Sequence, residues 1–468
     1  MLRINYILMA PFVSAIETGK YCGENNYEIH NYQKKKRKGI DKMPDFTTLS
    51  KLELEQLKDD LLAQYQTFKS RGLNLDITRG KPCPEQLDLA LDMLDCVNSK
   101  NYMTEEGTDS RNYGGLDGIP AAKKLFAEYL EVQPEELIIG GNSSLNLMHD
   151  AFMRAIVKGV SPDCPPWGKL AQIKFLCPSP GYDRHFFICE YLDIEMITVA
   201  MDENGPDMAA VEKLVSEDES IKGIWCVPKY SNPTGAVYSD DVVERLAAMP
   251  TKAADFRIFW DNAYTVHHLA DQPLLLKNIL EACKQAGHPE RVFIFGSTSK
   301  VAFAGSGLAM MAGSAKNMDH ARKQIAFQTI GPDKLNQLRH TAFFKNMDGI
   351  YDHMQKQAAI LKPKFDIVQS ELEKALGGKN IADWSRPKGG YFVSIDTMEG
   401  CAAEVIRMAE EAGVKLTPAG STYPYMRDPL DRNIRIAPSF PPLADIASAM
   451  QLVGICIQLA SVDKLINK

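Results

Sequence analysis

The middle of the chain alternates strand-like apolar runs with segments of helical periodicity. Strand followed by helix, repeated along a chain, is typical of a mostly parallel sheet that helices cover on both faces. The sequence therefore predicts an α/β fold with a large domain of this kind. The runs that we expect to form its strands are residues 173–177, 196–200, 221–227, 256–260, 292–295 and 308–312.

Four of these runs end in a conspicuous polar turn. The side chains in the turns are, in chain order, Tyr182 with His185, Asn232, Asp261 and Lys300. In open α/β sheets ligands bind beyond the carboxyl ends of the strands, so these side chains can face a single ligand. Each signal is weak alone, because a packing aromatic, a tight turn, a helix cap or a solvated loop lysine gives the same pattern.

Lys300 has the most specific surroundings of the four. The apolar run 292–295 breaks at Gly296, and small polar residues, Ser297 and Ser299 among them, lead directly to the lysine. Partial desolvation and a neighbouring cation lower the pKa of a lysine, and a neutral amine can form a Schiff base with an aldehyde. The hydroxyls and free N–H groups before it are suited to a phosphate.

A second anion site is predicted earlier in the chain. The stretch LIIGGNSSLNLMHDAF reads as strand, turn and helix, with Asn142, Ser143 and Ser144 at the start of the helix. Unpaired N–H groups and the helix dipole favour an anion there. The alternative is an ordinary serine cap without a ligand.

A phosphate, a flat ring, a phenolic oxygen, a basic ring nitrogen and an aldehyde would together satisfy these side chains, and pyridoxal 5′-phosphate (PLP) has all five. The order Asn232, Asp261, Lys300, with spacings of 29 and 39 residues, resembles the fold-type I PLP enzymes, specifically the class I aminotransferases. Within them the chain is most similar to an atypical bacterial group of aspartate aminotransferases. The resemblance covers residues 45–468 and implies a mostly parallel sheet of about seven strands between helices.

The resemblance implies a catalytic role for three residues. Lys300 would be the Schiff-base lysine and the proton shuttle, and Asp261 would keep the pyridine nitrogen protonated. Tyr264, with Asn232, would hydrogen-bond the ring oxygen. Tyr182 would stack on the ring, and His185 would support Asp261 from behind.

The remaining implied roles concern the phosphate and the substrate. Hydroxyls from four serines would hold the phosphate: Ser143, Ser144, Ser297 and Ser299. Tyr113, in a Gly-rich loop, would reach the same phosphate from a partner subunit, which implies a homodimer with shared active sites. Arg435 lies in an apolar run, where an unpaired guanidinium is costly, and would bind the substrate α-carboxylate together with Asn232. Gly80, between two basic residues, would face an anionic ligand; an exposed turn is the alternative.

Two departures from the family pattern stand out. Most class I members have a phosphate-binding arginine eight or nine residues after the lysine, where this chain has Leu308 and Ala309. The arginine that reads the side-chain carboxylate of aspartate has no clear match either. The candidates for that role are four basic residues, Arg79, Lys81, Arg111 and Lys334.

The two ends of the chain complete the expected organisation. Residues 1–42 combine a faint signal-peptide pattern with a basic cluster at 34–38, and we expect a disordered extension, with targeting as the alternative. The expected parts are this extension, a segment 43–90 that packs with the small domain, a large PLP-binding domain 91–344, and a small C-terminal α/β domain 345–468. Helices are expected at residues 48–71, 333–376, 402–412 and 443–465.

Composition excludes several other functions. The net charge of −7 gives no general attraction to nucleic acid. No run approaches the roughly 20 apolar residues of a membrane span. The ten cysteines are scattered without a CxxC pair, which favours reduced thiols and a cytoplasmic location.

The sequence therefore predicts a PLP-dependent transaminase that exchanges amino groups between L-aspartate and 2-oxoglutarate by a ping-pong mechanism. Another PLP-dependent aminotransferase, acting on alanine or aromatic substrates, or a lyase, would keep the same cofactor residues. A regulatory protein with an aminotransferase-like domain is the remote alternative, since about 42 residues of weak pattern are too few for a DNA-binding domain before it.

Overall fold

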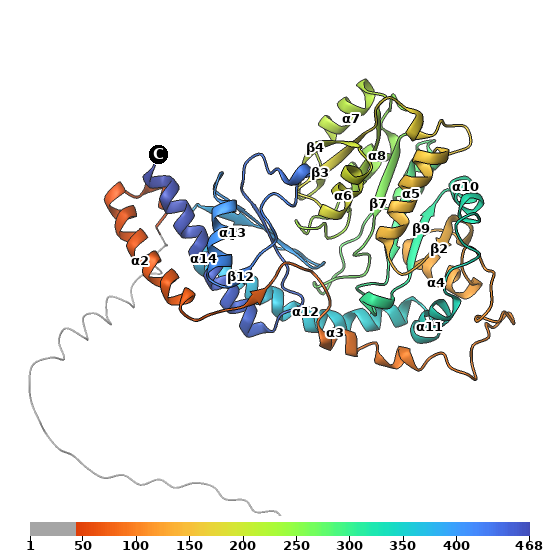
Figure 1. Cartoon of the computed structure of the whole chain (residues 1–468), viewed down its shortest axis with the longest axis horizontal. Coiled ribbons are helices and arrows are strands. Elements are labelled where there is room, and N and C mark those ends of the chain that lie inside the picture. The colour runs from red at the N-terminus through yellow and green to blue at the C-terminus, as the bar shows by residue number, and fades with distance from the viewer. Residues whose placement is uncertain (1–43) are drawn as a thin grey trace, which may run out of the picture. The chain divides into compact units, whose positions relative to one another are not determined.

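The computed structural model describes residues 44–468. The predicted extension at residues 1–42 lies outside the described residues. The main sheet has eight strands in the order β2-β9-β8-β7-β6-β3-β4-β5 (Figure 1). Its strands are β2 (Leu137–Ile139), β3 (Lys174–Ser179), β4 (Glu195–Asp202), β5 (Gly205–Pro206), β6 (Ile221–Cys226), β7 (Arg257–Asp261), β8 (Val292–Ser297) and β9 (Ala309–Gly313).

The predicted mostly parallel sheet is confirmed. Strands β4, β3, β6, β7 and β8 are parallel neighbours, and each of the six predicted runs forms a strand. The last run, β9, lies antiparallel between β8 and β2, and the two-residue strand β5 adds an antiparallel edge. Because the five parallel strands point the same way, their polar carboxyl-end turns lie along one edge of the sheet.

Alternate residues of each strand enter two different cores, one on each face of the sheet. On one face, Phe175, Trp225 and Phe259 pack with helices α5, α6 and α10. On the other, Leu176 and Ile258 belong to a core shared with α4, α7, α8 and α9. The helices are α4 (Pro120–Leu130), α5 (Ser144–Lys158), α6 (Asp183–Tyr191), α7 (Met208–Glu217), α8 (Asp240–Ala248), α9 (Ile279–Gln285) and α10 (Ala315–Ile325).

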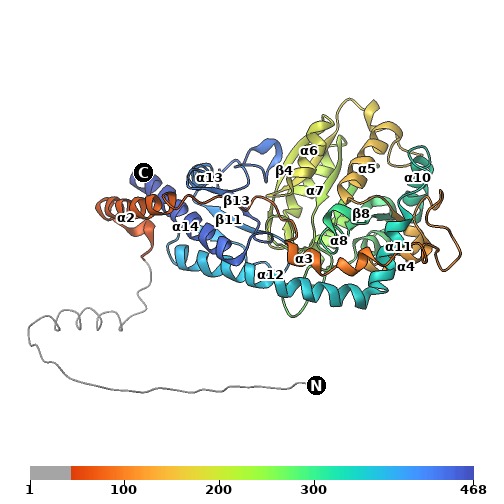
Figure 2. The same ribbon diagram turned by 60° about the horizontal axis from the view of Figure 1, so that its bottom comes forward.

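A third core combines the two ends of the described chain. Helix α2 packs against α14, near α13, so that the red and blue ends of the ribbon meet (Figures 1 and 2). The elements here are α2 (Lys51–Lys69), β1 (Leu75–Asp76), β10 (Ala382–Trp384), β11 (Val393–Thr397), α13 (Ala402–Glu411), β12 (Val414–Lys415), β13 (Asn433–Ile436) and α14 (Leu443–Ile466). Strands β10, β11 and β13 form an antiparallel sheet, and β1 pairs parallel with β12.

Helix α12 (Met347–Leu376) links this third core to the large sheet. Its first residues pack in the α4 core, whereas residues from Leu361 onward pack with α14. The predicted helical region 333–376 is interrupted: α11 (Lys334–Phe344) ends at Lys345, which has a positive φ of 66°. Short helix α3 (Pro84–Asp88) contacts α12. The domain limits proposed at residues 90 and 344 stay predictions.

Helix α14 is more apolar than its sequence stripe suggested. By length and composition it could cross a membrane, with a mean hydropathy of 1.6, but 67% of the relevant window is buried in the structure. Its contacts are with α2, α12 and α13. It therefore forms the centre of the third core.

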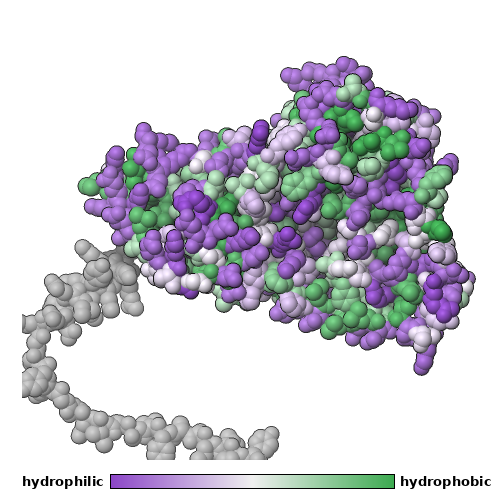
Figure 3. Space-filling view, viewed as in Figure 1, coloured by the Kyte–Doolittle hydropathy of each residue, from purple (hydrophilic) through white to green (hydrophobic). Residues whose placement is uncertain are grey.

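Hydrophilic residues cover much of the molecular face shown in Figure 3, where apolar residues occur in separate groups.

Candidate active site

The predicted site residues follow the carboxyl ends of four neighbouring parallel strands. Tyr182 follows β3 and caps α6, Asn232 follows β6, Asp261 ends β7, and Lys300 follows β8. Since β3, β6, β7 and β8 are adjacent, the fold brings these side chains to one edge. Residues 118 positions apart in sequence, from Tyr182 to Lys300, thus face the same region.

Asp261 is held by a buried histidine. His185 Nε2 lies 3.0 Å from Asp261 Oδ2, and both side chains are almost completely buried. The His185 ring stacks on Trp225, with centroids 4.1 Å apart and an interplanar angle of 5°. The other carboxylate oxygen, Oδ1, is buried and has no hydrogen-bond partner among the described residues. An unpaired buried carboxylate oxygen is costly, so this position suits a donor such as a protonated ring nitrogen.

Lys300 lies among aromatic rings. Its Nζ is 5.1 Å from the centroid of the Tyr264 ring and 6.0 Å from that of Tyr391. Burial lowers the pKa of Lys300, and the negative charge of Asp261 opposes that shift. A larger fraction of this amine is therefore neutral than in a solvated lysine, which favours nucleophilic and proton-transfer chemistry.

Tyr264 and Tyr182 are both in the neutral form, in which a tyrosine hydroxyl can donate a hydrogen bond. Burial raises the pKa of Tyr264 well above its ordinary value, and the charge of Asp261 adds to the shift. Burial likewise raises the pKa of Tyr182. The ring of Tyr182 meets the His185 ring edge-on, with centroids 4.9 Å apart.

Hydroxyl groups meet at the start of α5. The Ser297 hydroxyl donates to the Ser299 hydroxyl at 3.2 Å, and that hydroxyl donates to the Asn142 carbonyl at the same distance. Ser143 is the N-cap of α5, but its side chain forms no capping hydrogen bond, and Ser144 opens the helix. The first N–H groups of this helix therefore have no capping side chain, and the anion site predicted here stays a prediction.

Arg435 reaches the site from β13. Its Nη1 lies 3.4 Å from Asn232 Oδ1 and 3.5 Å from Asp183 Oδ1. Its Nε is buried without a partner among the described residues, and the guanidinium carbon lies 5.1 Å from the Phe392 ring centroid. Gly80 packs on the same ring, where an added Cβ would come within 2.6 Å of it. A larger residue at this position would require the Phe392 ring to move.

The other predicted residues lie apart from this cluster. Tyr113 is 81% exposed. Arg111 is paired with Asp109 at 2.7 Å, and Lys334 is buried and donates to the Gly114 carbonyl. Leu308 and Ala309, at the positions of the usual arginine, are buried. Arg339 of α11 reaches that loop, donating to the Ser306 hydroxyl at 2.6 Å.

Sequence reasoning missed four neighbours of the site: Asp183, Trp225, His267 and Tyr391. Asp183 directly follows Tyr182, and Tyr391 directly follows the two glycines Gly389 and Gly390. Position in the sequence alone could therefore have suggested both residues. His267 Nε2 lies 3.3 Å from the Lys300 carbonyl, and burial lowers the pKa of His267 to about 3. Neither His267 nor Trp225 had a signal that separated it from an ordinary core residue.

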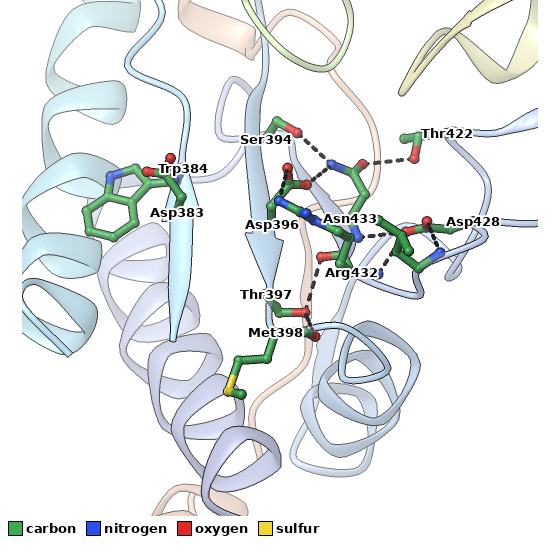
Figure 4. Close-up of polar contacts among 11 residues, drawn as sticks. Asp383, Trp384, Ser394, Asp396, Thr397, Met398, Thr422, Asp428, Arg432 and Asn433 are labelled. Carbon is green, nitrogen blue, oxygen red and sulfur yellow. Dashed lines mark hydrogen bonds and ion pairs between the residues drawn. The ribbon is translucent and has the colours of Figure 1, made fainter. Parts of the chain in front are cut away.

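A polar network ties the segment between β12 and β13 to the turn that carries Tyr182. The Gly181 N–H donates to the Thr422 carbonyl at 2.7 Å. The buried Asn433 amide bonds the Thr422 hydroxyl on one side and Ser394 and Asp396 on the other, each at 2.8 Å (Figure 4). The third core thus positions one wall of the site.

Known proteins of similar sequence belong to the family that the sequence resembles. The family model described as aspartate amino-transferase matches residues 49–468. The aspartate aminotransferase of Corynebacterium glutamicum is 43% identical over 409 residues, which are 87% of this chain and 94% of that protein.

Solved structures agree on the fold. The crystal structure of an aspartate transaminase from C. glutamicum has a TM-score of 0.88 at 42% identity and covers 90% of this chain and 99% of that one. The α-aminoadipate aminotransferase LysN of Thermus thermophilus has a TM-score of 0.67 at 20% identity, covers 90% of this chain and 97% of its own, and shares the fold. The chain belongs to the aspartate aminotransferase family.

Proposed function

We propose that this chain binds PLP and transfers the amino group of L-aspartate to 2-oxoglutarate by a ping-pong mechanism. One observation carries the proposal. At the ends of two adjacent strands the site presents a half-buried lysine with a lowered pKa and a buried aspartate with an unpartnered oxygen. These two groups match the aldehyde and the ring nitrogen of PLP.

The residues present fit the whole cofactor. The start of α5 and the hydroxyls of Ser297 and Ser299 would hold the phosphate. The resemblance to the family gives Tyr182 a ring-stacking role and assigns Asn232 and Tyr264 to the ring oxygen. When bound, PLP supplies an electron-withdrawing ring that makes the substrate Cα–H acidic.

The chain itself would then bind the substrate and move the proton. Arg435 would hold the α-carboxylate, because a guanidinium offers the charge-assisted, directional contacts that fix a carboxylate, and its Nε has no partner among the described residues. Asp261 would keep its negative charge against the ring nitrogen, supported by His185. The Lys300 amine would take the proton from Cα and return it on the cofactor side.

Recognition of the second carboxylate falls to the segment around Gly80. Of the four basic candidates, Arg111 and Lys334 are already engaged by Asp109 and by a backbone carbonyl. Arg79 is exposed and forms no salt bridge with any described residue. It adjoins Gly80, which touches the Phe392 ring beneath Arg435. We assign Arg79 to the substrate side chain.

The proposed assembly is a cytoplasmic homodimer in which Tyr113 of each subunit serves the partner's site. The exposure of Tyr113 supports this, as do other large exposed apolar side chains. Phe327 is 94% exposed and Leu275 is 89% exposed. A partner subunit that covered these two side chains would remove their apolar surface from water.

The decisive test is product formation by the purified protein supplied with PLP. We expect oxaloacetate and glutamate from L-aspartate and 2-oxoglutarate, with parallel lines in double-reciprocal plots. Lys300→Ala should abolish turnover, whereas the exposed lysine variant Lys316→Ala should not. Normal turnover by Lys300→Ala would overturn the proposal, and faster turnover of another amino acid would keep the mechanism but change the substrate.

A further inference from the structure

Asp183 occupies a place that the substrate is expected to need. Its Oδ1 lies 3.5 Å from Nη1 of Arg435, the group assigned above to the substrate α-carboxylate. The side chain of Arg435 is 7% exposed and that of Asp183 is 17% exposed. An aspartate carboxylate of the chain itself therefore faces the guanidinium.

We propose that Asp183 is a positioning residue that acts as an internal substitute for the substrate carboxylate. It pairs with Arg435 in the free enzyme and yields to the incoming acid. This inference rests on the proposed function, because it requires Arg435 to bind the α-carboxylate.

The physical case begins with the burial of Arg435. A buried guanidinium without a counter-charge is strongly disfavoured, and Asn232 offers only an uncharged oxygen at 3.4 Å. The ping-pong sequence releases one acid before it binds the next, so the guanidinium is left without substrate twice in each cycle. Asp183 supplies a counter-charge to Nη1 of Arg435 in those intervals.

Asp183 can also release Arg435 at a small cost in free energy. It is the first residue of α6, where the helix dipole and free N–H groups stabilise a negative charge. A pair distance of 3.5 Å is longer than that of a tight charge-assisted hydrogen bond. The N-terminus of α6 therefore still stabilises the Asp183 carboxylate when an acid displaces it from the guanidinium.

The position of Asp183 is set by both sides of the site. Asp183 lies on α6 of the large sheet, and Arg435 lies on β13 of the third core. The bond from the Gly181 N–H to the Thr422 carbonyl fixes the turn just before α6. The ion pair thus joins the two walls in the free enzyme, and the substrate carboxylate would take over this link.

The test measures the binding of succinate, an unreactive dicarboxylate, to the PLP-loaded enzyme by calorimetry. We expect Asp183→Asn to bind succinate about three- to tenfold more tightly than the wild type, because the competing charge is gone. The KM values for L-aspartate and 2-oxoglutarate should fall by a similar factor, while kcat should not rise. Asp183→Ser serves as a second variant should the first fail to fold.

Two controls make the result specific. Glu190→Gln removes an exposed negative charge from the same helix and should leave the succinate affinity unchanged. Combined with Arg435→Gln, the Asp183→Asn change should give no gain, because the contested guanidinium is absent.

Unchanged or weaker succinate binding by Asp183→Asn would overturn this inference, as would an equal gain in the Arg435→Gln background. Wild-type succinate affinity in Arg435→Gln alone would instead overturn the proposed role of Arg435. The two failures are therefore distinguishable.

Discussion

Lys300, to which we assign the proton transfer, also lowers the stability of the folded chain. Burial lowers its pKa in the folded protein, while in the unfolded chain a lysine titrates at about 10.4. As the pH falls through that value, the unfolded chain gains a proton that the folded chain resists, so stability is lost. The loss is complete below the lowered folded-state pKa.

We therefore expect cofactor-free Lys300→Met to melt at a higher temperature than the cofactor-free wild type at pH 7. The difference should shrink as the pH approaches about 10.4, where the unfolded lysine also becomes neutral. Thermal melts across this range check the prediction, with Lys316→Met as the exposed control. An equal or lower melting temperature of Lys300→Met at pH 7 would contradict it.

Arg79 is the residue on which the substrate assignment depends. Replacement by glutamine removes the positive charge and leaves the neighbouring Gly80 contact with Phe392 intact. Arg79→Gln should raise the KM for L-aspartate about tenfold or more, with little effect on L-alanine, which lacks the second carboxylate. Lys81→Gln is the matched control, because Lys81 Nζ already lies 3.8 Å from the Phe440 ring centroid. Equal losses for both amino acids would rule out this role.

At the scale of elements, the network around Asn433 fixes the segment that leads into β13. Asn433→Ala would leave the Thr422 hydroxyl, Ser394 and one oxygen of Asp396 without the bonds shown in Figure 4. We expect the free energy of unfolding to fall by about 1–3 kcal/mol.

Urea unfolding measures this loss, and Thr422→Val, which removes only one of the bonds, should lose about 1 kcal/mol. The larger variant should also raise the KM for both substrates, since the Thr422 carbonyl holds the turn before Tyr182 and Asp183. A fully stable Asn433→Ala would show that the network does not order this segment.

Elements with continuous apolar runs could be predicted from sequence, whereas their pairing could not. The runs at 221–227 and 292–295 were recognisable because buried parallel strands are apolar on both faces. The reversed direction of β9 depends on tertiary contacts with β2 and β8. The break between α11 and α12 occurs at Lys345, a residue with no intrinsic preference for positive φ.

In the site, too, some features could be predicted from the sequence and others could not. Lys300 and Asp261 could be proposed because each lies at or shortly after the end of a strand. The pair of Asp183 and Arg435, by contrast, joins residues 252 positions apart, one on helix α6 and the other on strand β13. Only the packing of the third core against the large sheet brings these two charges together.

At the scale of the whole molecule, the proposed dimer makes each site depend on two chains. Lys300 would come from one subunit and Tyr113 from the other, so a chain that lacks one residue could be rescued by a chain that lacks the other. The exposed position of Tyr113 within a single chain is what such an arrangement requires. Hybrid dimers can therefore separate the shared-site arrangement from one in which Tyr113 serves its own subunit.

We expect a hybrid of one Lys300→Ala chain and one Tyr113→Ala chain to regain about half of the native activity. In that hybrid, the site with a native Lys300 faces the native Tyr113 of the Lys300→Ala chain, and the second site lacks both residues. Two affinity tags isolate the hybrid from the two homodimers, which should both be impaired at limiting PLP. If Tyr113 served its own subunit, the only site with Lys300 would lack Tyr113, and the hybrid would stay as impaired as the Tyr113→Ala homodimer.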